Sequence, residues 1–210
     1  MDRPKQDLEV ILSECEEMEK VWTDPDFPTV KKSLCPPNEW NSKTWDCEVE
    51  WIRATKLPSL TDEEGDIRIF SDEFVPGNMS AGSLNDTYFL SVLGCISEKP
   101  ERIKKLFLVD EPNEWGVYGV QLTKNGLVTD ILVDDYIPCD QDQGEPVFAT
   151  TTDGDLWVLL LEKAWAKLHG SYMRIANGNH ATVFRDLTGA PTREWPIDEF
   201  DSSTLETALE

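Results

Sequence analysis

Thr87 stands where a polar loop meets an apolar run, a position from which a hydroxyl or thiol can act as a nucleophile. The first part of residues 78–96 is small and polar, as in a tight loop, and the run from Tyr88 to Ile96 is long enough for a buried helix. Asp86 or Thr87 can serve as the N-cap, because their side-chain oxygens accept hydrogen bonds from the free amides of the first turn. The positive end of the helix dipole stabilises an anionic nucleophile there. Cys95 lies two turns further on, and we interpret it as a core cysteine rather than a relocated nucleophile.

A helix and a hairpin elsewhere in the chain follow from their own patterns. Apolar residues at helical spacing predict an amphipathic helix over residues 7–21, which docks on its own domain in preference to a partner. Residues 115–123 and 127–133 predict two strands of a hairpin. Asn125 and Gly126 supply the turn, because Asn-Gly readily takes the positive φ angles of a type I′ turn.

Two more helices are predicted from their start and stop signals. The apolar run that begins at Leu156 indicates a helix with Asp153 or Asp155 as its cap and Gly170 at its end. A shorter helix is expected to start at Pro100, because proline is favoured in the first turn.

The loop before Thr87 also resembles the signature of a known family. The calpain motif Gln-Gly-x-Leu-Gly-Asp-Cys-Trp is similar to the run Ala81-Gly82-Ser83-Leu84-Asn85-Asp86-Thr87-Tyr88. Gly82, Leu84 and Asp86 of the motif are kept. The resemblance places the family's nucleophilic cysteine on Thr87, its oxyanion-hole glutamine on Ala81 and its tryptophan on Tyr88.

These replacements change the chemistry that the motif can do. A cysteine thiol has a reference pKa of about 8.5, whereas the Thr87 hydroxyl is far less acidic and its methyl group crowds the attack path. Threonine nucleophiles use an activating base such as their own N-terminal amine, which an internal residue does not have. Ala81 offers no side-chain donor to an oxyanion, and the loss of one such donor typically costs about 100- to 1000-fold in rate. The plainer interpretation, which we favour, is that Thr87 is a helix cap.

Other short runs resemble calpain elements along most of the chain. These are Trp51-Ile52-Arg53, Asp134-Asp135-Tyr136-Ile137-Pro138, the helix from Leu156 to Tyr172, and Asn177-Gly178. The helix is similar to the calpain run Phe-Trp-x-x-Leu-Leu-Glu-Lys-Ala-Tyr-Ala-Lys-x-x-Gly-x-Tyr. In the family, a glycine at the position of Gly178 contributes backbone contacts to bound peptide. A loop glycine kept only for its φ angle is the competing account.

The resemblance implies an α+β fold, the papain-like calpain protease core subdomain, with a central buried helix, flanking helices and a small antiparallel sheet or hairpin. We expect an N-terminal amphipathic helix within residues 1–21, core domain 1 in residues 22–195 and an acidic tail in residues 196–210. The family's catalytic His and Asn lie in a second core domain, in motifs that this sequence lacks. His169 and His180 sit in no matching motif.

The resemblance also implies a calcium site built from loop carbonyls and two carboxylates. The first carboxylate position falls on Asn78 and the second on Asp155, which is shorter than the family's glutamate. Calcium takes six to eight oxygen ligands, and its affinity follows ligand charge. Glu73 could compensate for the carboxylate lost at position 78. We therefore expect calcium to bind weakly or not at all, and we expect no other cofactor.

Composition excludes several classes of partner. The chain has 210 residues with 41 acidic and 19 basic side chains, a net charge of −22, which disfavours nucleic acid and anionic lipid. No apolar run approaches the length of a membrane span. The five cysteines are widely spaced and odd in number, which favours reduced thiols in an intracellular protein, cytoplasmic or associated with the cytoskeleton. The polar opening of the chain is unlike a signal peptide.

Two hypotheses of function follow. The leading one is an inactive calpain-like protease domain that acts as an interaction, scaffold or regulatory module. Its remnant substrate cleft, lined by Gly82, Asp86, Tyr88 and Gly178, would hold a partner protein or an extended peptide. The alternative is an active calcium-dependent cysteine-type endopeptidase, which requires a second calpain core domain that bears the His and Asn.

Overall fold

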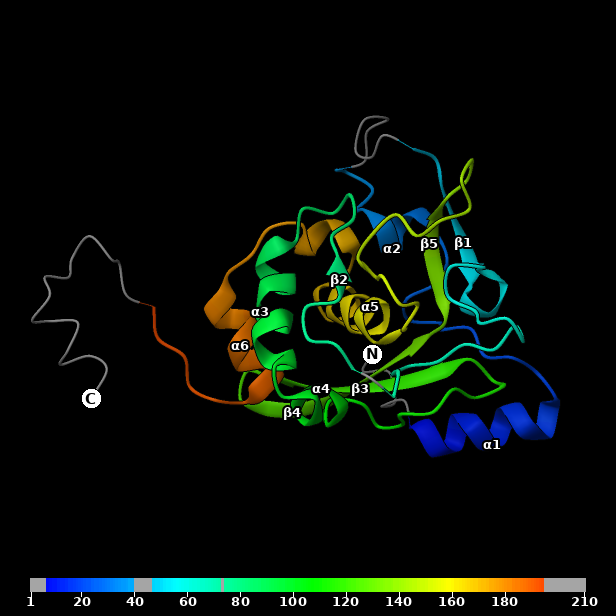
Figure 1. Cartoon of the computed structure of the whole chain (residues 1–210), viewed down its shortest axis with the longest axis horizontal. Helices are drawn as coiled ribbons and strands as arrows, with labels where there is room; N and C mark the ends of the chain where they lie inside the picture. Colours follow the sequence, from blue (N-terminus) through cyan, green and yellow to red (C-terminus); the bar gives the residue numbers. More distant parts are fainter. Residues whose placement is uncertain (1–6, 40–46, 73, 195–210) are drawn as a thin grey trace, which may run out of the picture.

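The computed structural model describes residues 7–39, 47–72 and 74–194, and these form an α+β fold (Figure 1). The described residues contain six α-helices, namely α1 (Leu8–Met18), α2 (Lys31–Leu34), α3 (Thr87–Ser97), α4 (Pro100–Lys104), α5 (Trp157–His169) and α6 (His180–Thr188). Six strands make three antiparallel pairs, namely β1 (Val49–Arg53) with β5 (Tyr136–Asp140), β2 (Met79–Ser80) with β6 (Thr150–Thr151), and β3 (Val117–Lys124) with β4 (Leu127–Asp134). The predicted class is confirmed.

Helix α5 runs through the middle of the molecule, with α3 and α6 on one side and the β1–β5 pair on the other (Figure 1). All of α5 except its last turn is buried, which makes it the centre of the core. Helix α3 packs onto it through Phe89 and Trp165, whose rings stack with centroids 5.5 Å apart. The predicted buried helix therefore exists as α3, but it keeps one exposed face along Thr87, Ser91 and Cys95. The interpretation of Cys95 as a core cysteine is wrong, since its side chain is exposed.

Helix α1 docks on its own domain, as its apolar face predicted. Asp7 is the N-cap, and its carboxylate accepts from the amides of the first turn. Ile11 and Cys15 are buried in a small cluster with Val117 of β3 and Leu132 of β4. The β3–β4 hairpin thus lies between α1 and the main core.

The predicted hairpin turn and the predicted end of α5 are both confirmed, and a glycine with a positive φ angle lies at each of them. Asn125 and Gly126 have φ angles of 52° and 78°, and the ladder closes directly on either side of them. Gly170 ends α5 with a φ of 98°, in the left-handed conformation that glycine adopts without strain.

The predicted side-chain caps of α3 and α5 are wrong. Asp86 occupies the N-cap position of α3 but makes no capping hydrogen bond. The N-cap of α5 is Leu156, and backbone carbonyls at Arg68 and Ile69 accept from the first amides of the helix. The start of α5 is therefore satisfied by backbone carbonyls from another segment instead of a local carboxylate.

Candidate functional site

The signature loop, residues 81–87, joins β2 to α3 and is held against a neighbouring segment by its backbone. A Cβ on Gly82 would lie 2.3 Å from the carbonyl oxygen of Phe148, so only glycine fits at this approach. The amide of Ser83 donates to the carbonyl of Val147 at 2.8 Å. The kept glycine of the motif is therefore required by packing.

The two positions that the resemblance assigns to catalysis are open to solvent. Thr87 is the first residue of α3 and is exposed, and Ala81 is exposed on the same loop. Amides of the first helical turn carry no intrahelical partner, so the helix presents its positive end beside Thr87. The structure therefore presents a hydroxyl at the first residue of α3, beside the positive end of the helix.

Asp86 is buried beneath the loop and pairs with a second carboxyl from α5. Its side chain hydrogen-bonds to Glu162, which is also buried. Glu162 Oε1 accepts from the amide of Ala149 at 3.2 Å. Burial raises the pKa of both carboxyls, and their mutual repulsion raises that of Glu162 further. This contact connects the floor of the signature loop to the core, and a hydrogen bond between two carboxyl groups requires a proton on one of them.

Tyr88 fixes the other side of the loop. Its hydroxyl donates to the carbonyl of Ile175 at 3.1 Å and lies 3.3 Å from Nε1 of Trp165. A Cβ on Gly178 would lie 2.4 Å from the Tyr88 ring. Since Gly178 does not have a positive φ, it is the close approach of the ring that requires a glycine. The account of Gly178 as a glycine kept for its φ angle is wrong.

Gly178→Ala is expected to lower the free energy of unfolding by about 1–3 kcal/mol, because the Tyr88 ring is held at its far end and cannot move aside freely. Urea unfolding followed by fluorescence measures this. Gly94→Ala is the matched control, because a Cβ there meets only Met79 at 3.5 Å and alanine favours the helix. Equal stability of the two variants would contradict the packing role.

Two of the three predicted metal ligands, Asn78 and Asp155, lie in the described residues, and both already have protein partners. Asn78 donates to a carboxylate oxygen of Asp153 at 2.5 Å. Asp155 is buried and accepts from Nε of Arg68 at 2.6 Å. Glu73 lies outside the described residues. Within the described part of the chain, no group of three or more His, Cys, Asp or Glu side chains is arranged to hold a metal ion.

The two histidines occupy different environments. His169, at the end of α5, packs on Trp165 with ring centroids 4.3 Å apart, and burial lowers its pKa. His180 begins α6 and lies edge-on to Tyr88 with centroids 6.4 Å apart. The sequence analysis missed this approach of His180 to the residue after Thr87, because no pattern connects α3 with α6.

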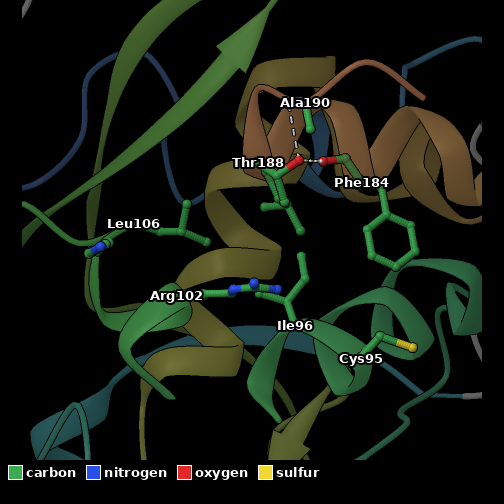
Figure 2. A pocket seen from close by; sticks show the side chains of 9 residues that line it. Cys95, Ile96, Arg102, Leu106, Phe184, Thr188 and Ala190 are labelled. Carbon is green, nitrogen blue, oxygen red and sulfur yellow. Dashed lines mark hydrogen bonds between the residues drawn. The ribbon is translucent and has the colours of Figure 1, made fainter. Parts of the chain in front are cut away.

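Figure 2 shows a separate pocket between α3, α4 and α6. Its volume is about 520 Å³, and Cys95, Arg102 and Phe184 are among the residues that line it. Neither Thr87 nor Ala81 lines this pocket. It therefore lies at the C-terminal end of α3, two turns away from the signature loop.

Comparison with known proteins shows the family of the chain. The profile of the calpain family cysteine protease domain matches residues 22–210. The Calpain-type cysteine protease DEK1 of Arabidopsis thaliana is 33% identical over 177 residues, which are 84% of this chain and 8% of the plant protein. Calpain-C of Drosophila melanogaster is 29% identical over 211 residues, 96% of this chain and 30% of the fly protein.

This chain thus spans less than a third of the length of either of those relatives. The profile covers the signature loop, the β3–β4 hairpin and α5 together, and the fold joins these elements in one core. The chain belongs to the calpain family of cysteine proteases.

Proposed function

We propose that this domain is a non-catalytic calpain core that serves as an interaction, scaffold or regulatory module. The observation that carries the proposal is the exposed Thr87 at the start of α3, where the family motif has cysteine. Ala81 on the same loop supports it, because alanine supplies no side-chain donor to an oxyanion. Without an ionised sulfur and a complete oxyanion hole, the loop retains shape but loses the means of acyl transfer.

A remnant cleft along the signature loop would hold an extended peptide or a partner loop. Gly82 and Gly178 are both exposed, so their backbone groups are accessible to a strand-like ligand. Asp86 and Tyr88 lie beneath this surface and keep it in one conformation. The same surface would face the second calpain core domain in a longer protein.

We place the protein inside the cell, in the cytoplasm or on the cytoskeleton, since its five cysteines are thiols rather than disulfides. Among the described residues, no helix is both long and apolar enough to span a membrane.

A fluorescence titration with labelled casein peptides tests the cleft. We expect saturable binding that Ala81→Trp abolishes, because the large ring fills the surface between Gly82 and the start of α3. Val128→Trp is the matched control, since Val128 is exposed on the β4 strand and lies outside the signature loop. Equal binding by the two variants, or no binding by the native chain, would count against the cleft.

The second candidate is a calcium-dependent endopeptidase that works with a His- and Asn-bearing domain. The Arabidopsis thaliana relative, a calpain-type cysteine protease, favours it. A casein cleavage assay of the protein joined to such a domain decides between the two. Turnover that Thr87→Ala abolishes would reverse our ranking.

Thr87→Cys in the 210-residue chain is expected to leave casein uncleaved. The variant restores a thiol but supplies no general base, and a cysteine nucleophile needs both. Alkylation by iodoacetamide, followed by mass spectrometry, verifies that the new thiol is accessible. Casein cleavage by the variant would reveal a base within this domain, with His180 the first candidate because it packs on Tyr88.

A further inference from the structure

Arg68 occupies the region where the calpain resemblance places a calcium ion. Its Nε donates to one carboxylate oxygen of Asp155 at 2.6 Å, and its Nη2 donates to the main-chain carbonyl of Asp153. The amide of Ser71 donates to the other Asp155 oxygen at 2.8 Å. Both oxygens of this buried carboxylate are therefore engaged by donors from residues 68–71.

The first ligand position is engaged as well. The Asn78 amide group donates to the Asp153 carboxylate at 2.5 Å, and its carbonyl oxygen accepts from the Thr152 hydroxyl. Calcium takes six to eight oxygens that are free to point at the ion. The oxygens of this region point at a guanidinium, an amide and a hydroxyl, so the donor set does not fit calcium.

We propose that Arg68 is a built-in cation that replaces calcium and fastens the segment before the signature loop to the start of α5. Arginine suits this role because its guanidinium is always charged and offers donors in a fixed fork. The Arg68 guanidinium donates to the Asp155 carboxylate and to the main-chain carbonyl of Asp153. Carboxylate and carbonyl oxygens are also the ligands that calcium ions bind in proteins.

The backbone of the same segment supports the assignment. The carbonyl of Arg68 accepts from the amide of Leu156 at 3.0 Å, and the carbonyl of Ile69 accepts from the amide of Trp157 at 3.2 Å. The segment of residues 68–71 thus accepts hydrogen bonds from the first amides of α5 and also donates hydrogen bonds to the Asp155 carboxylate. The chain then continues from residue 71 towards β2 and the signature loop, so the attachment holds one end of that connection whatever the calcium concentration.

This inference does not depend on the proposed interaction role, because it concerns only what holds the fold. The native chain is expected to show no calorimetric binding of Ca²⁺ at ~1 mM, a concentration that saturates sensor-type sites. Its melting temperature is likewise expected to move by less than about 1 °C. Binding in the native chain that Asp155→Asn removes would overturn the proposal without any need for an arginine variant.

The decisive variant combines Arg68→Gln with Asn78→Asp. It removes the guanidinium and restores a carboxylate, so Ca²⁺ is expected to raise its melting temperature by about 3 °C or more. Arg68→Gln alone is expected to melt about 3–8 °C below the native chain in the absence of Ca²⁺. Arg174→Gln is the matched control, because Glu39, the partner of Arg174, is half exposed, whereas Asp155, the partner of Arg68, is buried.

Two results would overturn the assignment. The first is a native-like melting temperature for Arg68→Gln, which would mean that the guanidinium fastens nothing. The second is a folded double variant that stays indifferent to Ca²⁺, which would mean that the arginine is not what excludes the ion. Circular dichroism of the double variant verifies that it is folded before the titration.

Discussion

Lys163→Met is expected to lower the free energy of unfolding by about 3–5 kcal/mol, the largest effect that the structure predicts for one side chain. Lys163 is fully buried on α5, and its ammonium group pairs with the Asp134 carboxylate. It also donates to the carbonyl of Asp134 at 3.0 Å and to that of Tyr136 at 2.6 Å. Methionine fills the space but leaves the Asp134 charge buried without its partner.

Urea unfolding followed by tryptophan fluorescence measures the loss. Lys32→Met is the control, since Lys32 is exposed on α2 and its replacement is expected to change stability by less than about 0.5 kcal/mol. Asp134→Asn tests the pair from the other side and should also be strongly destabilising. A Lys163→Met variant within ~1 kcal/mol of the native chain would show that the buried pair contributes little, as some buried pairs do.

The Lys163 pair belongs to a network that joins segments far apart in the sequence. Asp135 pairs with Arg53 of β1, and Lys167, one turn along α5, donates to the carboxylate of Asp24 at 2.6 Å. The network thus connects the chain before α2, the β1–β5 pair and the centre of the core. The carboxylates and cations balance, which is why so many charges can be buried together.

Motif matching found these residues but not their connection. Arg53, the two aspartates at 134–135 and the lysines of α5 were each recognised within separate short runs of the calpain pattern. Along one sequence only local rules apply, and these assign paired aspartates to a strand exit with Asx-type turns. Their charged partners lie 29 or more residues away, and no spacing rule predicts such contacts. The local Asx-type contact is present as well, since the amide of Tyr136 donates to Asp134 Oδ1 at 3.1 Å.

The elements that were predicted correctly are those with local determinants. The β3–β4 hairpin follows from Asn125-Gly126, and the end of α5 follows from Gly170. The pairing of β1 with β5 was not predicted, because it joins residues more than 80 positions apart. The acidic tail, residues 196–210, lies outside the described residues and stays a prediction.

The misplaced caps show how tertiary contacts override a local preference. Asp86 and Asp155 stand where a capping carboxylate is favoured, yet they bind Glu162 and Arg68 instead. One signal could have revealed this outcome. Glu162 lies in an α5 sequence that is apolar around most of the helix, so burial of its carboxyl, with a proton or a partner, follows from the pattern alone.

The Asp86–Glu162 pair predicts a specific dependence of stability on pH. Burial raises the pKa of both carboxyls in the folded chain, so the folded chain binds more protons than the unfolded chain. The contribution of this pair to stability is therefore greatest below the unfolded pKa values, about 4, and falls as pH rises from there towards the raised folded values. Each carboxyl that is protonated when folded and ionised when unfolded removes about 1.4 kcal/mol per pH unit.

Glu162→Gln is expected to flatten this decline and to make the chain more stable than the native one near neutral pH. Glutamine keeps an oxygen for the amide of Ala149 and can donate to Asp86, but it has no proton to lose. Urea unfolding at about pH 4.5, 6 and 7.5 gives the slope, with Glu63→Gln, an exposed site, as the control. Parallel curves for the native chain and Glu162→Gln would mean that the two carboxyls share no proton. The signature loop would then rest on an ionised pair, and a different group would have to compensate that charge under Thr87.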